Sequence, residues 1–285
     1  MILLLLAGCG ARTPSTLTPL PDESLARQLR AGRLALDAGR FDEAARQYGE
    51  ALRRARERDA ADDIADAATG RAAALLAKGD AAGAQEQAAS VSLELRRRGA
   101  APPAGLILAE ATARYRRPDH EGALPLLIGL RDATDRDAAL RAAFIEGLIA
   151  AARQDAPGLR AARERLGTPA SFAFRADATE LDSRTALLAG DAAVATSRAE
   201  EAAALRRDAL DYRGLGRALE LAADAARLTG DREREADFAL RAAQGAAARG
   251  DKPEATRLLL RARGAAGTPA LRAAIAREQA ALDAR

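Results

Sequence analysis

Apolar residues recur along most of this chain at intervals of three and four positions, with charged residues at the positions between them. This spacing is typical of amphipathic α-helices, which bury one face. The clearest stripes are Leu25, Leu29, Gly32 and Leu36; Phe41, Ala44, Ala45, Tyr48, Leu52 and Ala55; Ala84, Ala88, Val91 and Leu95; Leu140, Phe144, Gly147, Leu148 and Ala151; and Leu215, Leu219, Ala222 and Ala226. The nearest approach to a strand pattern, residues 171–175, is too short to build a sheet. The pattern predicts an all-α protein.

Short turns separate these stripes at regular intervals. Glycines followed by Asp or Arg end several helical runs, at Gly39, Gly79, Gly190, Gly230 and Gly250. The interval from Gly39 to Gly79 equals that from Gly190 to Gly230, and the interval from Gly230 to Gly250 is half as long and holds one helix. Glycine ends a helix in the left-handed conformation at little cost, and an Asp after it caps the next helix. The turns therefore predict a series of antiparallel helical hairpins.

The segment 39–52 resembles the second helix of a tetratricopeptide repeat. Ala44, Tyr48 and Ala51 occupy the small, large aromatic and small positions of that family, and Gly32 matches the small position of its first helix. The resemblance implies an α-solenoid, in which each hairpin buries its apolar face against its neighbours and the stack presents a concave face to a peptide or protein partner. The interval from Gly39 to Gly79 is longer than the usual repeat of that family, which longer helices would explain.

The resemblance covers most of residues 22–285 as architecture, with 229–242 as a weaker copy of the motif. We expect two blocks of helical repeats, at 22–166 and 183–285. Residues 167–182 carry no clean helical period and are expected to form an irregular connection, either a turn or a hinge. A proline at position 125 is expected in the first turn of a helix formed by the apolar run that contains it.

The N-terminal residues Leu6, Ala7, Gly8 and Cys9 follow a short apolar run and contain the only cysteine of the chain. They resemble the lipobox of bacterial lipoproteins. In that family a signal peptidase recognises the residues before the cysteine and removes the leader, and the cysteine thiol carries a diacylglyceryl group. The resemblance implies a signal peptide at 1–8 and a lipid anchor on Cys9.

A single cysteine in an exported protein cannot form an internal disulfide, and acylation would account for it. No basic residue precedes the apolar run, which departs from the usual signal peptide; a start codon placed too far downstream, or a trimmed sequence, would explain this. The alternative is a chance apolar run at the start of a cytosolic domain. Residues 9–21, rich in Pro and Thr, are expected to form a flexible tether. Gly10 after the cysteine weakly favours the outer membrane.

Composition restricts the partners. Aromatic residues make up 3% of the chain and tryptophan is absent, so the core must be built from Ala and Leu. The 44 basic and 41 acidic residues leave a net charge of only +3. The longest basic run, Arg96–Arg98, falls at an expected helix C-terminus, where cations are favoured. No basic stripe with interleaved aromatic residues is present, so we expect no nucleic-acid partner.

Signs of catalysis are weak. His120, the only histidine, is expected at a helix start, and with the cysteine lipidated the chain cannot form a zinc site of the usual kind. The acidic clusters 59–63 and 132–137 lack the spacing of a calcium loop. Gly214 and Gly216 lie within a helical period and do not form a nucleotide loop. We expect no cofactor, no metal and no catalytic residue.

The leading hypothesis is a non-enzymatic lipoprotein of the bacterial envelope, most consistent with the outer membrane facing the periplasm. It would act as a tetratricopeptide-like scaffold or adaptor for a periplasmic or outer-membrane protein, in envelope assembly or secretion. Two alternatives stay open: a cytosolic helical-repeat adaptor, and an envelope glycan hydrolase with paired carboxylates. Phe41 and Tyr48 could contact a partner, but filling the repeat core is the favoured interpretation of both.

Overall fold

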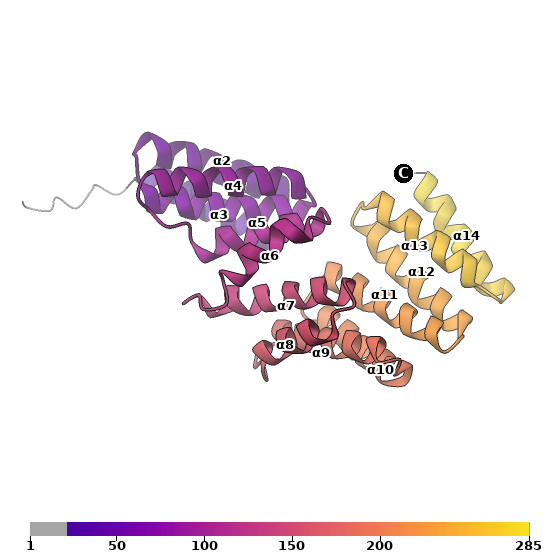
Figure 1. Cartoon of the computed structure of the whole chain (residues 1–285). Helices are drawn as coiled ribbons and strands as arrows, with labels where there is room; N and C mark the ends of the chain where they lie inside the picture. The colour runs from indigo at the N-terminus through magenta and orange to yellow at the C-terminus, as the bar shows by residue number, and fades with distance from the viewer. Residues whose placement is uncertain (1–21, 285) are drawn as a thin grey trace, which may run out of the picture.

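The computed structural model describes residues 22–284, which contain fourteen α-helices and no strand. The helices are α1 (Glu23–Asp37), α2 (Phe41–Glu57), α3 (Ala61–Lys78), α4 (Ala81–Arg97), α5 (Ala104–Arg116), α6 (His120–Ile128), α7 (Arg136–Ala152), α8 (Ala156–Leu166), α9 (Phe172–Leu188), α10 (Ala192–Asp208), α11 (Tyr212–Leu228), α12 (Arg232–Ala248), α13 (Lys252–Ala265) and α14 (Pro269–Asp283). Each packs against the next along the chain (Figure 1). The fold is an all-α solenoid of the tetratricopeptide-like kind, as the sequence predicted.

The turns follow the predicted mechanism. The left-handed residues that end helices are evenly spaced, at positions 39, 59, 79 and 99 and again at 190, 210, 230 and 250. After five of these turns an aspartate carboxylate at the next N-terminus accepts a backbone hydrogen bond, for example Asp80 from Gly83 at 2.9 Å and Asp231 from Arg234 at 3.0 Å; α2, α3 and α5 begin without a side-chain cap. Each repeat is therefore a helical hairpin that extends from one left-handed residue to the second one after it.

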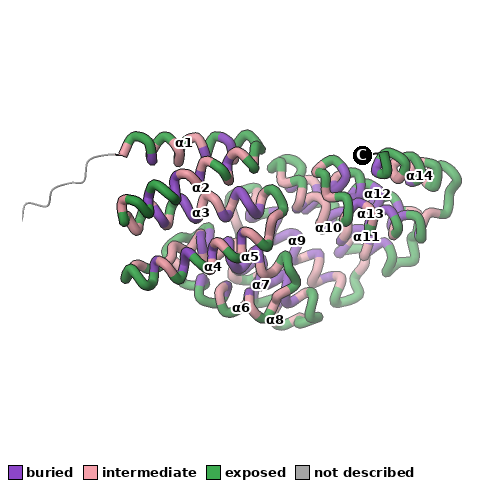
Figure 2. Tube along the Cα trace, turned by 90° about the horizontal axis from the view of Figure 1, so that it is seen from above, coloured by how far each residue is buried: buried purple, intermediate pink, exposed green. Residues whose placement is uncertain are grey.

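Alanine and leucine fill the core, as composition predicted. One cluster of buried residues joins α1 to α5, and another joins α10 to α14. We call these two sets of helices the N-terminal arm (α1–α5) and the C-terminal arm (α10–α14). Between them α7 is buried on almost every side, because α5, α6, α8 and α9 all contact it. Figure 2 shows the buried residues along the inner sides of the stacked helices.

Tyr48 is 6% exposed and lies between Gly32 of α1 and Gly70 of α3. A Cβ atom on Gly32 would lie 2.9 Å from Tyr48 Cδ2, and one on Gly70 would overlap the other edge of the ring. Ala44 and Ala51 on the same helix are fully buried. Gly32 and Tyr48 therefore pack against each other, and Tyr48, Ala44 and Ala51 all belong to the buried interior.

The expected irregular connection at 167–182 is wrong for most of its length. Helix α9 begins at Phe172, and the Ser171 hydroxyl caps it by accepting from Phe174 N at 3.3 Å. The sequence hid this helix because its buried positions include Asp177 and Glu180, so that no apolar period is visible. Since α9 contacts α7, α8, α10 and α11, a packed helix and not a hinge joins the two blocks.

The position expected for Pro125 is also wrong. Helix α6 begins at His120, with Asp119 as its cap, so Pro125 lies in the helix interior and not in the first turn. Proline has no N–H, so the hydrogen bond to the carbonyl of Glu121 cannot form. The helix ends at Ile128 after nine residues, the shortest of the fourteen that the structure describes.

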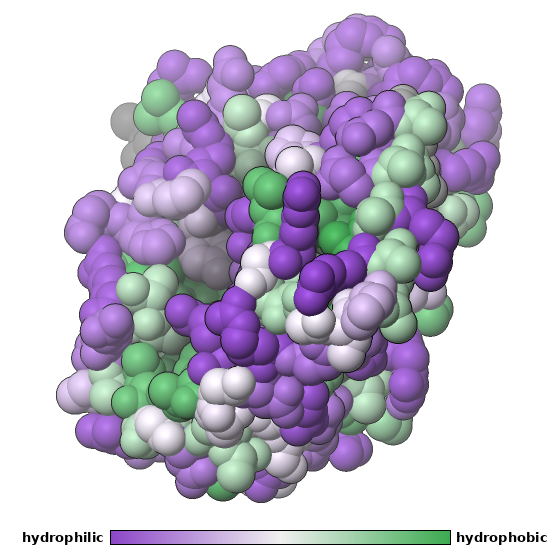
Figure 3. Space-filling view, turned by 90° about the vertical axis from the view of Figure 1, so that its right-hand side faces the viewer, coloured by the Kyte–Doolittle hydropathy of each residue, from purple (hydrophilic) through white to green (hydrophobic). Residues whose placement is uncertain are grey.

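Hydrophilic side chains cover most of the face shown in Figure 3, and its apolar surface is confined to patches. None of the helices within residues 22–284 combines the length and the apolar character that crossing a membrane would need.

Candidate interaction groove

A groove lies between the two arms, where the turns of the N-terminal arm face α11 and α12. It consists of two hollows of about 760 and 480 Å³ that share Arg116, Arg213 and Arg249. The first hollow is lined by residues 39–43, Ala77, Lys78 and 210–213 in addition to the shared arginines, and the second by Gly79, Ala81, Tyr115, Gly216, Arg217, Glu220, Ala242, Asp251, Pro253, Glu254, Arg257 and Leu258. Figure 1 shows the N-terminal arm and helices α11 to α13 on opposite sides of this region.

Most charged groups of the groove are paired with each other. Lys78 Nζ lies 2.8 Å from Asp42 Oδ1. Arg257 contacts Glu220 at 2.8 Å and Glu254 at 2.6 Å. The carboxylates on these walls are therefore already neutralised by cations of this chain.

Arg116 and Arg249 instead donate to backbone carbonyls. Arg116 Nη1 lies 2.6 Å from the oxygen of Leu76, in the last turn of α3, and Arg249 Nη1 lies 2.9 Å from the oxygen of Tyr212. The negative end of the α3 dipole favours a cation at that place. Neither guanidinium group has a carboxylate within ion-pair distance among the described residues.

Within residues 22–284, Arg213 has only a long contact with a carboxylate. Its nearest carboxylate contact is Asp251, at 3.9 Å, and its Nη2 would lie 3.5 Å from a Cβ atom on Gly79, across the groove. Burial, together with the charges of Arg213 and Arg217, lowers the pKa of Arg116 to about 10. Burial and the charge of Arg213 also lower the pKa of Arg249. The charge of Arg213 therefore repels those of Arg116 and Arg249.

Apolar side chains stand at the lip of the groove. Leu210 is 69% exposed and Tyr212 is 53% exposed, and half-buried Phe41 lines the same hollow from α2. Leu210 has a φ of 57°, in the left-handed region, whereas Gly190 and Gly230 occupy the same turn position in the neighbouring repeats. A residue with a Cβ atom costs about 1 kcal/mol there. The chain thus holds an exposed leucine in a strained conformation beside the arginines.

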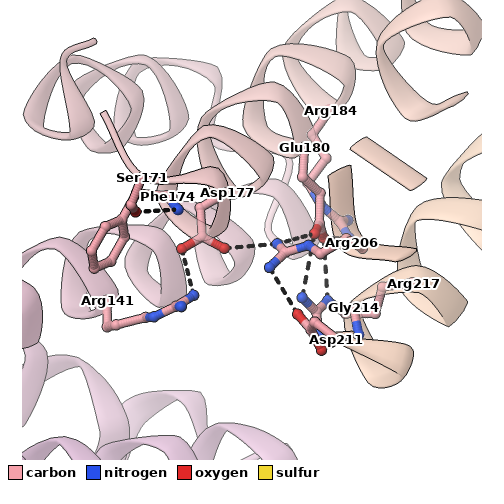
Figure 4. A network of polar contacts seen from close by, with 10 residues as sticks. All are labelled: Arg141, Ser171, Phe174, Asp177, Glu180, Arg184, Arg206, Asp211, Gly214 and Arg217. Carbon is pink, nitrogen blue, oxygen red and sulfur yellow. Dashed lines mark hydrogen bonds and ion pairs between the residues drawn. The ribbon is translucent and has the colours of Figure 1, made fainter. Parts of the chain in front are cut away.

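A buried network of ion pairs fixes the start of α11 (Figure 4). Arg206, whose side chain is 2% exposed, lies 2.7 Å from Asp177, 2.8 Å from Glu180 and 2.9 Å from Asp211. The other oxygen of Asp211 accepts from Gly214 N at 2.8 Å and caps α11. The helix that carries Arg213 is therefore tied to α9 and α10.

Glu180 is the centre of this network. Besides Arg206 it accepts from Arg184 at 3.0 Å and from Arg217 at 3.2 Å. Burial alone would raise the pKa of Glu180, but the charges of Arg217, Arg184 and Arg206 hold it well below its usual range. Burial raises the pKa of Asp177, against the opposing effect of Arg141 and Arg206. These carboxylates have a structural role, because all their close partners are cations of the same chain.

The residues of the chemical motifs lie elsewhere. His120 begins α6 as expected and stacks on Tyr115 with ring centroids 5.8 Å apart. Gly214 and Gly216 lie within α11, as expected. Among residues 22–284 no cluster of three or more His, Cys, Asp or Glu side chains is arranged to hold a metal ion. Cys9, the residues Leu6, Ala7 and Gly8 before it and the tether at 9–21 fall outside the described residues.

Sequence reasoning missed the three arginines of the groove. Arginine is spread along the whole chain, so the sequence does not show which guanidinium groups lack a close carboxylate. One signal was present. Leu210 stands at a turn position where the regular spacing places glycine at 190, 230 and 250, and unlike Asp59 and Gln154 in the same conformation it is an exposed apolar residue.

Comparisons with known proteins add no family assignment. No protein-family model matches the chain, and no curated protein matches it. Among solved structures, a tetratricopeptide repeat protein from Parabacteroides merdae is 14% identical, covers 90% of this chain and 100% of its own, and has a TM-score of 0.49. The apo quorum sensor NprR from B. thuringiensis (14% identity, 91% of this chain, 70% of its own) has a TM-score of 0.46, and NprR in complex with its cognate peptide NprX (12%, 92%, 72%) one of 0.45. The helix packing described above identifies the chain as a tetratricopeptide-like α-solenoid.

Proposed function

We propose that this chain is a non-enzymatic scaffold that binds a segment of a protein partner in the groove between its arms. The observation that carries the proposal is the groove itself, where Arg116 and Arg249, which have no carboxylate at ion-pair distance among the described residues, lie with Arg213 beside exposed apolar side chains. Stacked helical repeats commonly bind partners on their concave surface. Interfaces also favour arginine and aromatic residues at their centre.

The proposed scaffold is attached to the bacterial envelope through a lipid on Cys9, and residues 9–21 form its tether. This part of the proposal rests on the resemblance of Leu6–Cys9 to a lipobox. A random-coil tether of this length would place the helices roughly 20 Å from the anchor. Two or more acyl chains would give stable attachment.

The two alternative functions, a cytosolic adaptor and a glycan hydrolase, place different requirements on Cys9 and on the carboxylates of the groove. A cytosolic adaptor would use the same groove but keep a bare Cys9 thiol. A glycan hydrolase would need two carboxylates free to act on substrate in a cleft. In the groove Asp42, Glu220 and Glu254 are each paired with a cation, which favours the scaffold.

The anchor is tested by mass spectrometry of the protein isolated from its native membrane. The expected N-terminal peptide begins at Cys9 and carries a diacylglyceryl thioether, and Cys9→Ser moves the protein to the soluble fraction. A bare thiol with the leader still attached would contradict the anchor and leave the scaffold proposal in place.

The groove is tested by site-specific photo-crosslinking in cells. A photoreactive residue at Tyr212, in the groove, is expected to capture a discrete partner band. The matched control is Val194, which is 45% exposed on α10 and outside the groove. Equal capture at both positions, or capture at Val194 alone, would contradict the proposal.

A further inference from the structure

We propose that the groove selects an acidic peptide segment of its partner. Carboxylates of that segment would bind Arg116, Arg213 and Arg249, and an adjacent apolar side chain would pack on Leu210 and Tyr212. This inference rests on the proposed function and specifies the chemistry of the partner.

The first argument for an acidic ligand is the charge of the groove. The acidic side chains that line the groove already have partners in this chain: Asp42 with Lys78, Glu43 with Arg46, Asp211 with Arg206, and Glu220 and Glu254 with Arg257. Asp251 caps α13. Among the described residues, Arg116 and Arg249 therefore have no carboxylate at ion-pair distance, and Arg213 has only the long contact with Asp251, at 3.9 Å. A carboxylate from outside would form charge-assisted hydrogen bonds with these arginines and relieve their mutual repulsion.

The three arginines come from both arms. Arg116 ends α5 in the N-terminal arm, whereas Arg213 lies in the first turn of α11 and Arg249 follows the end of α12. A bound acidic segment would contact both arms at once. Because binding to the folded state alone raises its stability, the segment is expected to raise the melting temperature of the protein.

Leu210 gives a second and independent observation. A glycine at this turn would remove the left-handed strain and the exposed apolar surface together, as glycine does at 190 and 230. Strained residues that persist in a fold cluster at functional sites. The leucine therefore indicates an apolar contact with the ligand, which favours a peptide over a simple anion.

The test uses the purified full-length chain and fluorescence anisotropy. The probe is a labelled peptide of glutamates around one leucine, and the control peptide carries glutamine at every glutamate. We expect the glutamate peptide to bind and the glutamine peptide to bind at least about tenfold more weakly. Binding should also weaken with rising salt. Equal binding of the two peptides would overturn the inference.

The double variant Arg213→Gln/Arg249→Gln tests the arginines. It is expected to bind the glutamate peptide at least about tenfold more weakly than the native chain. The matched control, Arg30→Gln/Arg277→Gln, removes the same charge from exposed positions outside the groove and is expected to change binding less than twofold. Equal losses in both variants would mean that only net charge matters, and would overturn the inference. Binding of inorganic phosphate or phosphatidylglycerol vesicles that depends on Arg213 and Arg249, without binding of the peptide, would overturn it as well and assign the groove to another ligand.

The variant Leu210→Gly removes the apolar contact with the ligand without an expected loss of stability. The variant is expected to melt at the same temperature or higher, because the strain is removed, and to bind the leucine-containing peptide about fivefold more weakly. A peptide with glycine in place of its leucine should bind both forms equally. Unchanged binding of the leucine peptide would overturn the apolar part of the inference. If crosslinking at Tyr212 succeeds while the acidic peptide fails to bind, the scaffold proposal stands and this inference fails.

Discussion

Helices α1–α4 and helices α9–α11 both pack side by side along the chain, but their buried residues differ: those of α1–α4 are almost all apolar, and those of α9–α11 include charged side chains. In α1–α4 the only buried polar residue is Ser92, and alanine, leucine and Tyr48 fill the interfaces. In α9–α11 the buried residues include Asp177, Glu180 and Arg206. Apolar packing tolerates small rearrangements, whereas ion pairs in the interior require their partners at defined positions. The charged interfaces lie where the chain must hold α11 against the groove.

The largest effect is expected from Glu180→Ala. The substitution leaves Arg184, Arg206 and Arg217 without their shared carboxylate in the interior, which should lower the free energy of unfolding by about 3–5 kcal/mol. Urea denaturation followed by circular dichroism measures the change. Glu201→Ala, which removes an exposed partner of Arg198, should cost about 0–1 kcal/mol. Similar losses in the two variants would show that the network is not a structural centre.

Acid should act on the charged region first. The pKa of Glu180 is lowered in the folded state, so its contribution to stability is present above its ordinary pKa and is lost as the pH falls from there towards the lowered value. The slope approaches about 1.4 kcal/mol per pH unit for one group. Asp177 has a raised pKa and contributes in the opposite direction. Unfolding free energies between pH 6 and 3 should fall for the native chain and less steeply for Glu180→Gln; parallel profiles would contradict this.

Gly70→Ala tests the apolar region. The added Cβ overlaps the Tyr48 ring, so stability should fall by about 1–3 kcal/mol even though alanine is the better helix former. Tyr48→Leu should remove most of this penalty in a double-mutant cycle. Gly264→Ala is the matched control, because a Cβ atom on this helical glycine meets nothing within 4 Å. Additive losses from Gly70→Ala and Tyr48→Leu would rule out the contact as the cause.

The smallest effect is expected at a helix cap shared by both regions. Asp80→Ala and Asp191→Ala each remove one carboxylate that accepts a backbone N–H, and each should cost about 1 kcal/mol. Thermal denaturation should show nearly equal shifts, since the caps do not depend on the type of core. Markedly different shifts would mean that the two regions do not share one turn mechanism.

The sequence predicted the apolar region α1–α4 more accurately than the charged region α9–α11. Residues 39–52 combine an apolar period, a turn and a repeat motif, so their helix and its buried face could be predicted. Helix α9 hides Asp177 and Glu180 in positions that a sequence pattern assigns to solvent, because the partners that make their burial tolerable come from α7, α10 and α11. A single sequence does not contain those pairings.

The sequence predicted the candidate groove even less well than helix α9. The repeats predicted a concave surface. Arg116 and Arg249 can be recognised only in the folded chain, where their guanidinium groups contact backbone carbonyls and no carboxylate of the described residues lies at ion-pair distance. Position 210 was the exception, because a leucine stands there between turns that carry glycine at 190 and 230, which is visible without coordinates. Departures from a repeat are therefore more informative about function than the repeat itself.

The short helix α6 has a consequence for the spacing of the two arms. Its nine residues span about 14 Å, against about 26 Å for a helix of 17 residues such as α7. A superhelix of equal units has a constant pitch, and a shorter unit changes the pitch at that point. Helix α6 contacts α5 of the N-terminal arm and α7, so we expect its short length to affect how the stack continues towards the C-terminal arm, although Pro125 does not line the groove. A chain with a full-length helix in place of α6 is then expected to space its two arms differently while keeping Arg116, Arg213 and Arg249.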